Sequence, residues 1–372
     1  MRAILALEDG TIFEGESLGA AGRTYGEAVF NTGMTGYQEI LTDPSYAGQM
    51  VALTYPMIGN YGINPDDFES RRVQVEGLIV REAASQASNW RSVQTLHAFL
   101  KERGVVAIEG IDTRALTRAL RVRGVMMGAI STDETAEELL ARLRSTPNYA
   151  DNDFARKVTT EAPYFWKAGT DRPIPLIQEQ TEREKEGRRR ISLLDCGVKY
   201  NIIRCLANLD CDVTVYPCTT PAEVILRENP DGIMLSPGPG DPEHYGYIVE
   251  TVRKFIGKKP ILGVCLGNQL LGKAFGSKTF KLKFGHRGGN HPVKDLQTGK
   301  VVITSQNHGY ALDPDALRDG MEVAYINLND GTVEGLRHKE LPIFSIQYHP
   351  EASPGPMDSA YFFKQFVESL GS

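Results

Sequence analysis

Cys265 lies in a sequence that could present a nucleophile. It is the third residue of GVCLGNQ (263–269), which follows the apolar run 260–262 and leads into a predicted helix over 269–275. The pattern predicts a tight strand-to-helix turn, where backbone N–H groups of the helix point at whatever the thiol attacks. A helix N-terminus also favours the reactive thiolate over the thiol. The alternative is a small buried cysteine that closes a core strand, the commonest fate of a free cysteine.

His349 is the best candidate for the base that such a nucleophile needs. It ends the apolar segment 343–348 and is followed by Pro350, which stops a strand. Glu351 is two positions further on and could hydrogen-bond to the far ring nitrogen, as the third member of a triad does. Among the other six of the seven histidines, His308 could also line the site, from a loop predicted after a strand at 301–304.

The elements from residue 191 onward must position these side chains. Short apolar strands alternate with helices, and this predicts a doubly wound, mostly parallel sheet. The predicted strands are 191–195, 213–216, 232–235 and 261–264, and the predicted helices are 200–209, 222–228 and 250–256. In this fold ligands bind beyond the C-terminal ends of the strands. Gly238, Gly240 and Cys265 all follow such ends, so we expect them to face one crevice.

The first half of the chain predicts a separate α/β domain over residues 1–150. Strand-like segments (3–7, 11–14 and 28–31) precede helical ones (96–103 and 136–144), with many turn signals between them. Residues 151–190 are polar and proline-containing and end in mixed charges, which predicts a linker. The second domain then spans 191–372.

Composition excludes several classes of function. The 372 residues have a net charge of −6 and a pI near 5.8 without a basic stripe, which argues against nucleic-acid binding. We expect no signal peptide and no membrane span, because no apolar run reaches about 18 residues. Five cysteines without a C-x-x-C pair indicate a reducing, cytoplasmic location. We also expect no metal site, since no cysteine pair accompanies His286 and His291.

Two groups of motifs resemble known families. GVCLGNQ (263–269) and QYHPE (347–351) look like the signature of class I glutamine amidotransferases, a likeness that runs from about residue 191 to 368. FNTGMTGYQEILTDPSY (30–46) is similar to the N-terminal domain of the carbamoyl-phosphate synthase small-subunit family. FGHRGGNHP (284–292) and EASPGP (351–356) are similar to the same family, so the resemblance covers nearly the whole chain.

The resemblance implies glutamine hydrolysis by a Cys-His-Glu triad. Cys265 would attack the side-chain amide and form a γ-glutamyl thioester, His349 would activate the thiol and protonate the departing ammonia, and Glu351 would orient His349. Backbone N–H groups of Leu266 and Gly238 would hold the oxyanion. The positions that match the glutamine-gripping residues are Ser45, Gly240, Gln269, Asn307, Gly309 and Tyr310. Of these, Ser45 would act from the first domain.

The resemblance also implies a large partner subunit that binds the N-terminal half. That subunit would receive the ammonia and use ATP and magnesium to make carbamoyl phosphate from bicarbonate, for arginine and pyrimidine biosynthesis. We expect a heterodimer or an assembly of heterodimers. The chain itself is expected to hold no cofactor. Its near P-loop at 267–274 ends in Ala274 rather than a hydroxyl residue, and its Gly238-Pro239-Gly240 turn lacks a third glycine.

Asn268 departs from the family pattern, since many relatives have histidine there. It is no triad member, so we expect the chemistry to survive, although the response to the partner could differ.

Two alternatives to this function stay open. A free-standing γ-glutamyl hydrolase or another amidotransferase subunit is disfavoured by the 30–46 segment. A non-catalytic interaction module is disfavoured by the joint presence of Cys265, His349 and Glu351.

Overall fold

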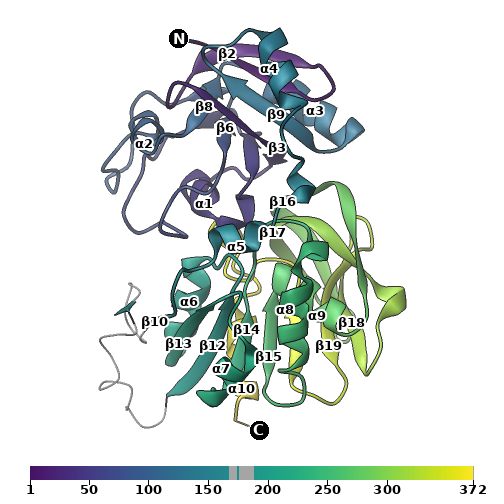
Figure 1. Cartoon of the computed structure of the whole chain (residues 1–372). Helices are drawn as coiled ribbons and strands as arrows, with labels where there is room; N and C mark the ends of the chain where they lie inside the picture. The colour runs from purple at the N-terminus through teal and green to yellow at the C-terminus, as the bar shows by residue number, and fades with distance from the viewer. Residues whose placement is uncertain (167–173, 176–187, 372) are drawn as a thin grey trace. The chain divides into compact units, whose positions relative to one another are not determined.

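The computed structural model describes residues 1–166, 174–175 and 188–371 (Figure 1). They form two compact units. Unit 1 consists of Met1–Asn152 with Lys283–Gly288, and unit 2 of Asp153–Leu282 with Gly289–Ser372. Much of the linker predicted over 151–190 lies outside the described residues. Its described part includes helix α5 (Phe154–Val158) and the short strands β10 (Tyr164–Trp166) and β11 (Ile174–Pro175).

Unit 1 is built around a closed barrel in the strand order β1-β2-β8-β6-β4-β3-β9. The barrel closes because β9 pairs with both β1 and β3. The strands are β1 (Arg2–Leu7), β2 (Ile12–Ser17), β3 (Arg23–Asn31), β4 (Gln49–Leu53), β6 (Gly77–Ile79), β8 (Val106–Glu109) and β9 (Met126–Ser131). A separate two-stranded sheet joins β5 (Met57–Ile58) and β7 (Glu82–Ala83).

Helices pack on the barrel through residues that alternate along its strands. Val29 and Val51 pack in one core with helices α1 and α2. Ala28 and Phe30 pack in a second core with helix α3. This alternation follows from the two-residue period of a strand. The helices are α1 (Tyr37–Thr42), α2 (Leu96–Glu102), α3 (Thr113–Arg123) and α4 (Ala136–Leu143), and a short 3₁₀ helix, η1 (Pro44–Tyr46), follows α1.

Unit 2 contains an eleven-stranded sheet in the order β11-β10-β13-β12-β14-β15-β20-β19-β18-β16-β17. Its centre, from β13 to β20, is parallel, as the sequence predicts. The strands are β12 (Arg189–Asp195), β13 (Cys211–Pro217), β14 (Gly232–Leu235), β15 (Ile261–Val264), β16 (Lys278–Asp295), β17 (Val301–Asp313), β18 (Met321–Asn327), β19 (Val333–His338) and β20 (Ile343–Ile346). The sheet continues beyond β20 through antiparallel pairing of β19 and β18.

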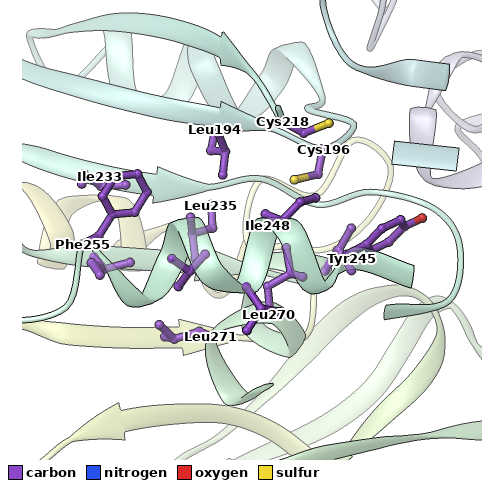
Figure 2. Packing of buried hydrophobic residues seen from close by; sticks show 14 of the residues in the cluster. Leu194, Cys196, Cys218, Ile233, Leu235, Tyr245, Ile248, Phe255, Leu270 and Leu271 are labelled. Atoms are coloured by element: carbon purple, nitrogen blue, oxygen red, sulfur yellow. The ribbon is translucent and has the colours of Figure 1, made fainter. Parts of the chain in front are cut away.

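Helices cover both faces of the parallel strands. The helices are α6 (Tyr200–Ala207), α7 (Ala222–Arg227), α8 (Gly246–Arg253), α9 (Leu266–Ala274) and α10 (Tyr361–Ser369). Ile233 and Leu235 of β14 pack with α7, α8 and α9, while Met234 between them packs with α6 and α10. Figure 2 shows Leu270 and Leu271 of α9 in the first of these cores, beside Ile248 of α8. This packing fixes the helix that follows Cys265.

The prediction of a loop after residue 304 is wrong. Residues 307–310 lie within β17, which continues to Asp313. Asn307, His308 and Tyr310 are buried although polar, so the sequence shows no apolar alternation that would indicate a strand here.

Within the part of the chain that the structure describes, no helix has the length and apolar character needed to cross a membrane.

Candidate active site

Cys265 occupies a strained turn between β15 and α9. Its backbone angles are φ 53° and ψ −105°, a combination that costs energy for a residue with a side chain. The flanking glycines are needed because the backbone is crowded here. A Cβ on Gly263 would come within 2.7 Å of the Gly267 carbonyl oxygen, and a Cβ on Gly267 would overlap the carbonyl oxygen of Leu235. The turn therefore depends on glycine at both positions.

Cys265 is held by hydrogen bonds to two other strands, one from its backbone and one from its thiol. Its backbone N–H donates to Ile346 O of β20 at 2.8 Å, and Sγ donates to Asn307 O of β17 at 3.6 Å. The residue is 2% exposed. Leu266 begins α9, so the first N–H groups of that helix adjoin the sulfur. The sulfur therefore lies in a closed, fixed position at a helix N-terminus.

His349 and Glu351 form a buried pair just beyond the end of β20. His349 Nδ1 and Glu351 Oε1 are 2.6 Å apart, and both side chains are at most 2% exposed. The backbone N–H of His349 donates to Ser305 O at 2.9 Å, while Nε2 has no partner within hydrogen-bond geometry among the described residues. Burial lowers the pKa of His349, but the charges of Glu351 and Cys265 outweigh burial and raise this pKa to about 10. The fold thus favours an imidazolium facing the cysteine.

Lys199 is a member of this cluster that sequence reasoning missed. Its Nζ lies 3.1 Å from Glu351 Oε1 and donates to Ala352 O at 2.6 Å, with the side chain 3% exposed. Burial raises the pKa of Glu351, but Lys199 and then His349 lower it to about 2. Lys199 follows the end of β12, and that position at a strand's C-terminal end was the one signal available.

Asn201, in the first turn of α6, holds the same loop. Its Nδ2 donates to Glu351 O at 2.7 Å and to Ser353 Oγ at 2.9 Å. The Glu351 backbone is therefore fixed independently of its carboxylate.

Gly238 and Gly240 follow β14, in a loop next to the cysteine turn. A Cβ on Gly238 would come within 2.8 Å of Leu266 Cδ2, so its backbone lies against the residue after Cys265. Gly240 has φ +90°, which favours glycine. Tyr245 Oη donates to Pro239 O at 2.7 Å and fixes the loop between them. The structure thus brings Gly238 and Leu266 together, beyond the ends of the paired parallel strands β14 and β15.

The other predicted binding residues fall into two groups. In unit 2, Gln269 Nε2 donates to Tyr310 O at 2.8 Å, and Asn307 accepts from the Cys265 thiol, with Gly309 between Asn307 and Tyr310 in β17. Ser45 lies in η1 of unit 1, where its N–H donates to Asp43 Oδ1 at 2.8 Å. The Ser45 hydroxyl is buried and has no hydrogen-bond partner among the described residues. A buried, unsatisfied hydroxyl is uncommon and consistent with a ligand contact.

Two other buried ionisable side chains of unit 2 make hydrogen bonds within the protein. Glu334 accepts from Gln306 Nε2 at 2.9 Å and from Asn327 Nδ2 at 2.8 Å, one bond to each oxygen. His308 Nδ1 lies 2.8 Å from Tyr310 O. These bonds engage both oxygens of Glu334 and one of the two ring nitrogens of His308.

Known proteins match both parts of the chain. Residues 192–369 match the family model "Glutamine amidotransferase class-I", and residues 5–130 match "Carbamoyl-phosphate synthase small chain, CPSase domain". A carbamoyl phosphate synthase small chain of Syntrophotalea carbinolica is 52% identical over 371 residues, which cover 100% of this chain and 98% of the relative. Proteins of the same name from Aquifex aeolicus (52% identical, 98% of each chain) and a Nostoc species (52%, 100% of this chain and 95% of the relative) are equally similar.

Proposed function

This chain belongs to the carbamoyl phosphate synthase small-chain family, and from that premise we propose that it hydrolyses L-glutamine to glutamate and ammonia for a larger synthase chain. The strongest support is the buried His349–Glu351 pair beyond the end of β20, next to a cysteine on a strained turn. Acyl transfer requires a nucleophile, a base and an acid that orients the base, and here all three follow the ends of strands.

The reaction would proceed through a thioester. The Cys265 thiolate attacks the side-chain amide carbon of glutamine, and His349, protonated below about pH 10, donates its Nε2 proton to the departing ammonia as the C–N bond breaks. Neutral His349 then takes a proton from water, which attacks the γ-glutamyl thioester and releases glutamate and the thiolate. The negative charge of Glu351 stabilises the imidazolium in both steps, and Lys199 keeps Glu351 ionised.

Backbone N–H groups of Leu266 and Gly238 would stabilise the tetrahedral oxyanion. The close approach of these two residues supports this assignment, because glycine at 238 allows the backbone to reach the reacting carbonyl. The substrate's α-amino and α-carboxylate groups would be bound by the remaining predicted residues, Ser45, Gly240, Gln269, Asn307, Gly309 and Tyr310.

The ammonia would pass to the large chain along a protected path, because free ammonia at neutral pH becomes ammonium and loses its nucleophilicity. The large chain would use ATP and magnesium to convert bicarbonate and ammonia to carbamoyl phosphate, for arginine and pyrimidine biosynthesis in the cytoplasm. The two chains would form a heterodimer or an assembly of heterodimers, with unit 1 contributing the docking surface.

Replacing the nucleophile tests this function. In the complex with the large chain, Cys265→Ser should lower glutamine hydrolysis by at least about a thousandfold. Carbamoyl phosphate synthesis from added ammonium salts should persist, since ammonia bypasses the small chain. Cys205→Ser, at a half-exposed cysteine of α6, is the matched control and should retain activity.

The outcomes also separate the alternatives. Full hydrolysis by the chain alone, with no effect of the large chain, would favour a free-standing γ-glutamyl hydrolase. Equal hydrolysis by the Cys265→Ser and parent chains would refute the nucleophile assignment. Absence of hydrolysis by the parent complex would favour a non-catalytic module.

A further inference from the structure

Four buried polar side chains connect the cysteine turn to the strand that precedes His349. Asn268 and Gln269 lie in the first turns of α9, Ser345 lies in β20, and Gln347 directly follows that strand. All four are at most 3% exposed. Buried amides are costly unless their donors and acceptors are matched, so the orientation of each amide carries information.

One backbone carbonyl fixes the orientation of the whole group. Tyr310 O can only accept, so the 2.8 Å contact from Gln269 must be made by Nε2. The other hydrogen of Gln269 Nε2 is donated to Gln347 Oε1 at 3.1 Å.

Asn268 completes the sequence of hydrogen bonds. Gln347 Oε1 accepts a second hydrogen bond, from Asn268 Nδ2 at 3.2 Å, and Asn268 Oδ1 accepts from Ser345 Oγ at 2.8 Å. Each of these four contacts, from Tyr310 to Ser345, therefore pairs a donor with an acceptor.

Gln347 adopts this orientation at a cost. Its Nε2 is buried and has no hydrogen-bond partner among the described residues. An unsatisfied buried donor is destabilising, so two donors, Asn268 and Gln269, must hold the oxygen in place. Without Asn268 one donor remains, and Gln347 could turn its Nε2 toward Gln269. Two N–H groups would then face each other, and Gln269 would lose its fixed orientation.

The orientation of Gln269 determines what it can recognise. With both Nε2 hydrogens used inside the protein, the group left for a ligand is Oε1, to which no bond is recorded among the described residues. An amide oxygen accepts from an ammonium group and repels a carboxylate. Gln269 also lies one helical turn after Cys265, whose carbonyl accepts the Gln269 N–H at 3.2 Å.

We propose that Asn268, supported by Ser345, is a positioning residue that holds Gln347 and thereby fixes Gln269 with its oxygen toward the α-ammonium group of the substrate. The inference rests on the proposed glutaminase function and adds the residues behind the binding site. The proposal also predicts that histidine can replace Asn268 without loss of binding. A neutral imidazole offers one donor and one acceptor on opposite sides, as Asn268 does here.

Binding of two ligands to the full chain tests the proposal. In a Cys265→Ser background, which stops turnover, calorimetry would measure affinity for L-glutamine and for glutaramate, the same molecule without the α-amino group. Asn268→Leu should weaken L-glutamine binding by about tenfold, the value of one hydrogen bond to a charged group, and leave glutaramate binding unchanged. Asn268→His should bind both ligands as the parent does.

Ser345→Ala guards against loss of folding in the leucine variant. It removes only the donor to Asn268 Oδ1 and should weaken L-glutamine binding selectively, by a smaller factor. Equal weakening of both ligands, or no weakening of L-glutamine in either variant, would overturn the proposal. Failure of the Cys265→Ser parent to bind L-glutamine would instead refute the proposed function, and this inference with it.

Discussion

The ion pair between Lys199 and Glu351 controls the charge of the candidate site at the scale of single residues. Both side chains are almost fully buried, so each charge requires the other. Glu351 also accepts from His349, which means that Lys199 acts on the histidine through the carboxylate. A positive residue that contacts the acid of the His349–Glu351 pair can thus set the protonation of the pair.

Lys199→Met should therefore destabilise the protein and make it more sensitive to acid. Removing one partner of a buried pair leaves an uncompensated charge and should lower the free energy of unfolding at neutral pH by about 3 kcal/mol. The pKa of Glu351 is lowered from 4.5 to about 2 in the fold, so its stabilisation is present above pH 4.5 and lost as pH falls toward 2. Without Lys199 the pKa of Glu351 should rise toward 4.5, so less of this stabilisation is present at neutral pH. The less stable variant should then unfold at a higher pH, measured as a raised midpoint of acid unfolding.

Lys364→Met is the matched control for this variant. The Lys364–Glu368 pair is exposed on α10 and 3.7 Å apart, so its removal should change stability little. Equal acid sensitivity of the two lysine variants would contradict the role assigned to Lys199.

Ser45 should affect binding without affecting stability. Its hydroxyl is buried with no hydrogen-bond partner among the described residues, so Ser45→Ala removes no internal bond. We expect the KM for glutamine to rise by about tenfold, while the free energy of unfolding stays within about 0.5 kcal/mol of the parent value. Steady-state kinetics and denaturant unfolding would measure the two effects. A loss of stability with unchanged KM would show that the hydroxyl is structural.

At the scale of elements, the turn between β15 and α9 depends on close backbone packing. α9 begins so near β14 that Gly267 leaves no room for a Cβ beside Leu235 O. The geometry of the nucleophile is therefore set by glycine positions rather than by hydrogen bonds of the cysteine side chain alone.

Gly267→Ala should disturb this packing, whereas Gly246→Ala should not. Overpacking at Gly267 should lower the free energy of unfolding by about 2 kcal/mol and reduce glutamine hydrolysis through displacement of Cys265. Gly246 begins α8 with φ −51°, and its Cβ would meet no atom within 4 Å. Alanine there should stabilise the protein slightly, because it restricts the unfolded chain. Denaturant unfolding of the two variants checks both signs, and a harmless Gly267→Ala would refute the packing argument.

The parallel strands could be predicted from sequence because they are buried on both faces and read as continuous apolar runs, such as Ile261–Val264. The positions of Cys265 and His349 at strand ends followed from the same runs. β17 could not be predicted at 307–310, because the buried side chains of Asn307, His308 and Tyr310 are polar and give no apolar alternation. Lys199 was missed because its partner Glu351 is brought to it only by folding.

At the scale of the whole molecule, the proposed reaction makes sense only as part of a complex. Ammonia released without an acceptor wastes glutamine, so hydrolysis should be fastest when the large chain is bound. A partner can favour the active arrangement only if it binds that arrangement more tightly than the inactive one.

Thermodynamic linkage turns this into a measurement that requires no turnover. If the large chain raises the affinity of the small chain for glutamine by some factor, glutamine must raise the affinity between the two chains by the same factor. With Cys265→Ser chains, we expect a factor of about ten, a typical coupling free energy of about 1.4 kcal/mol. Calorimetric titration of glutamine with and without the large chain gives one value, and titration of the chains with and without glutamine gives the other. If both affinities rise by the same factor, the two sites are coupled through the small chain. If neither affinity changes, the large chain does not control the affinity of the glutamine site.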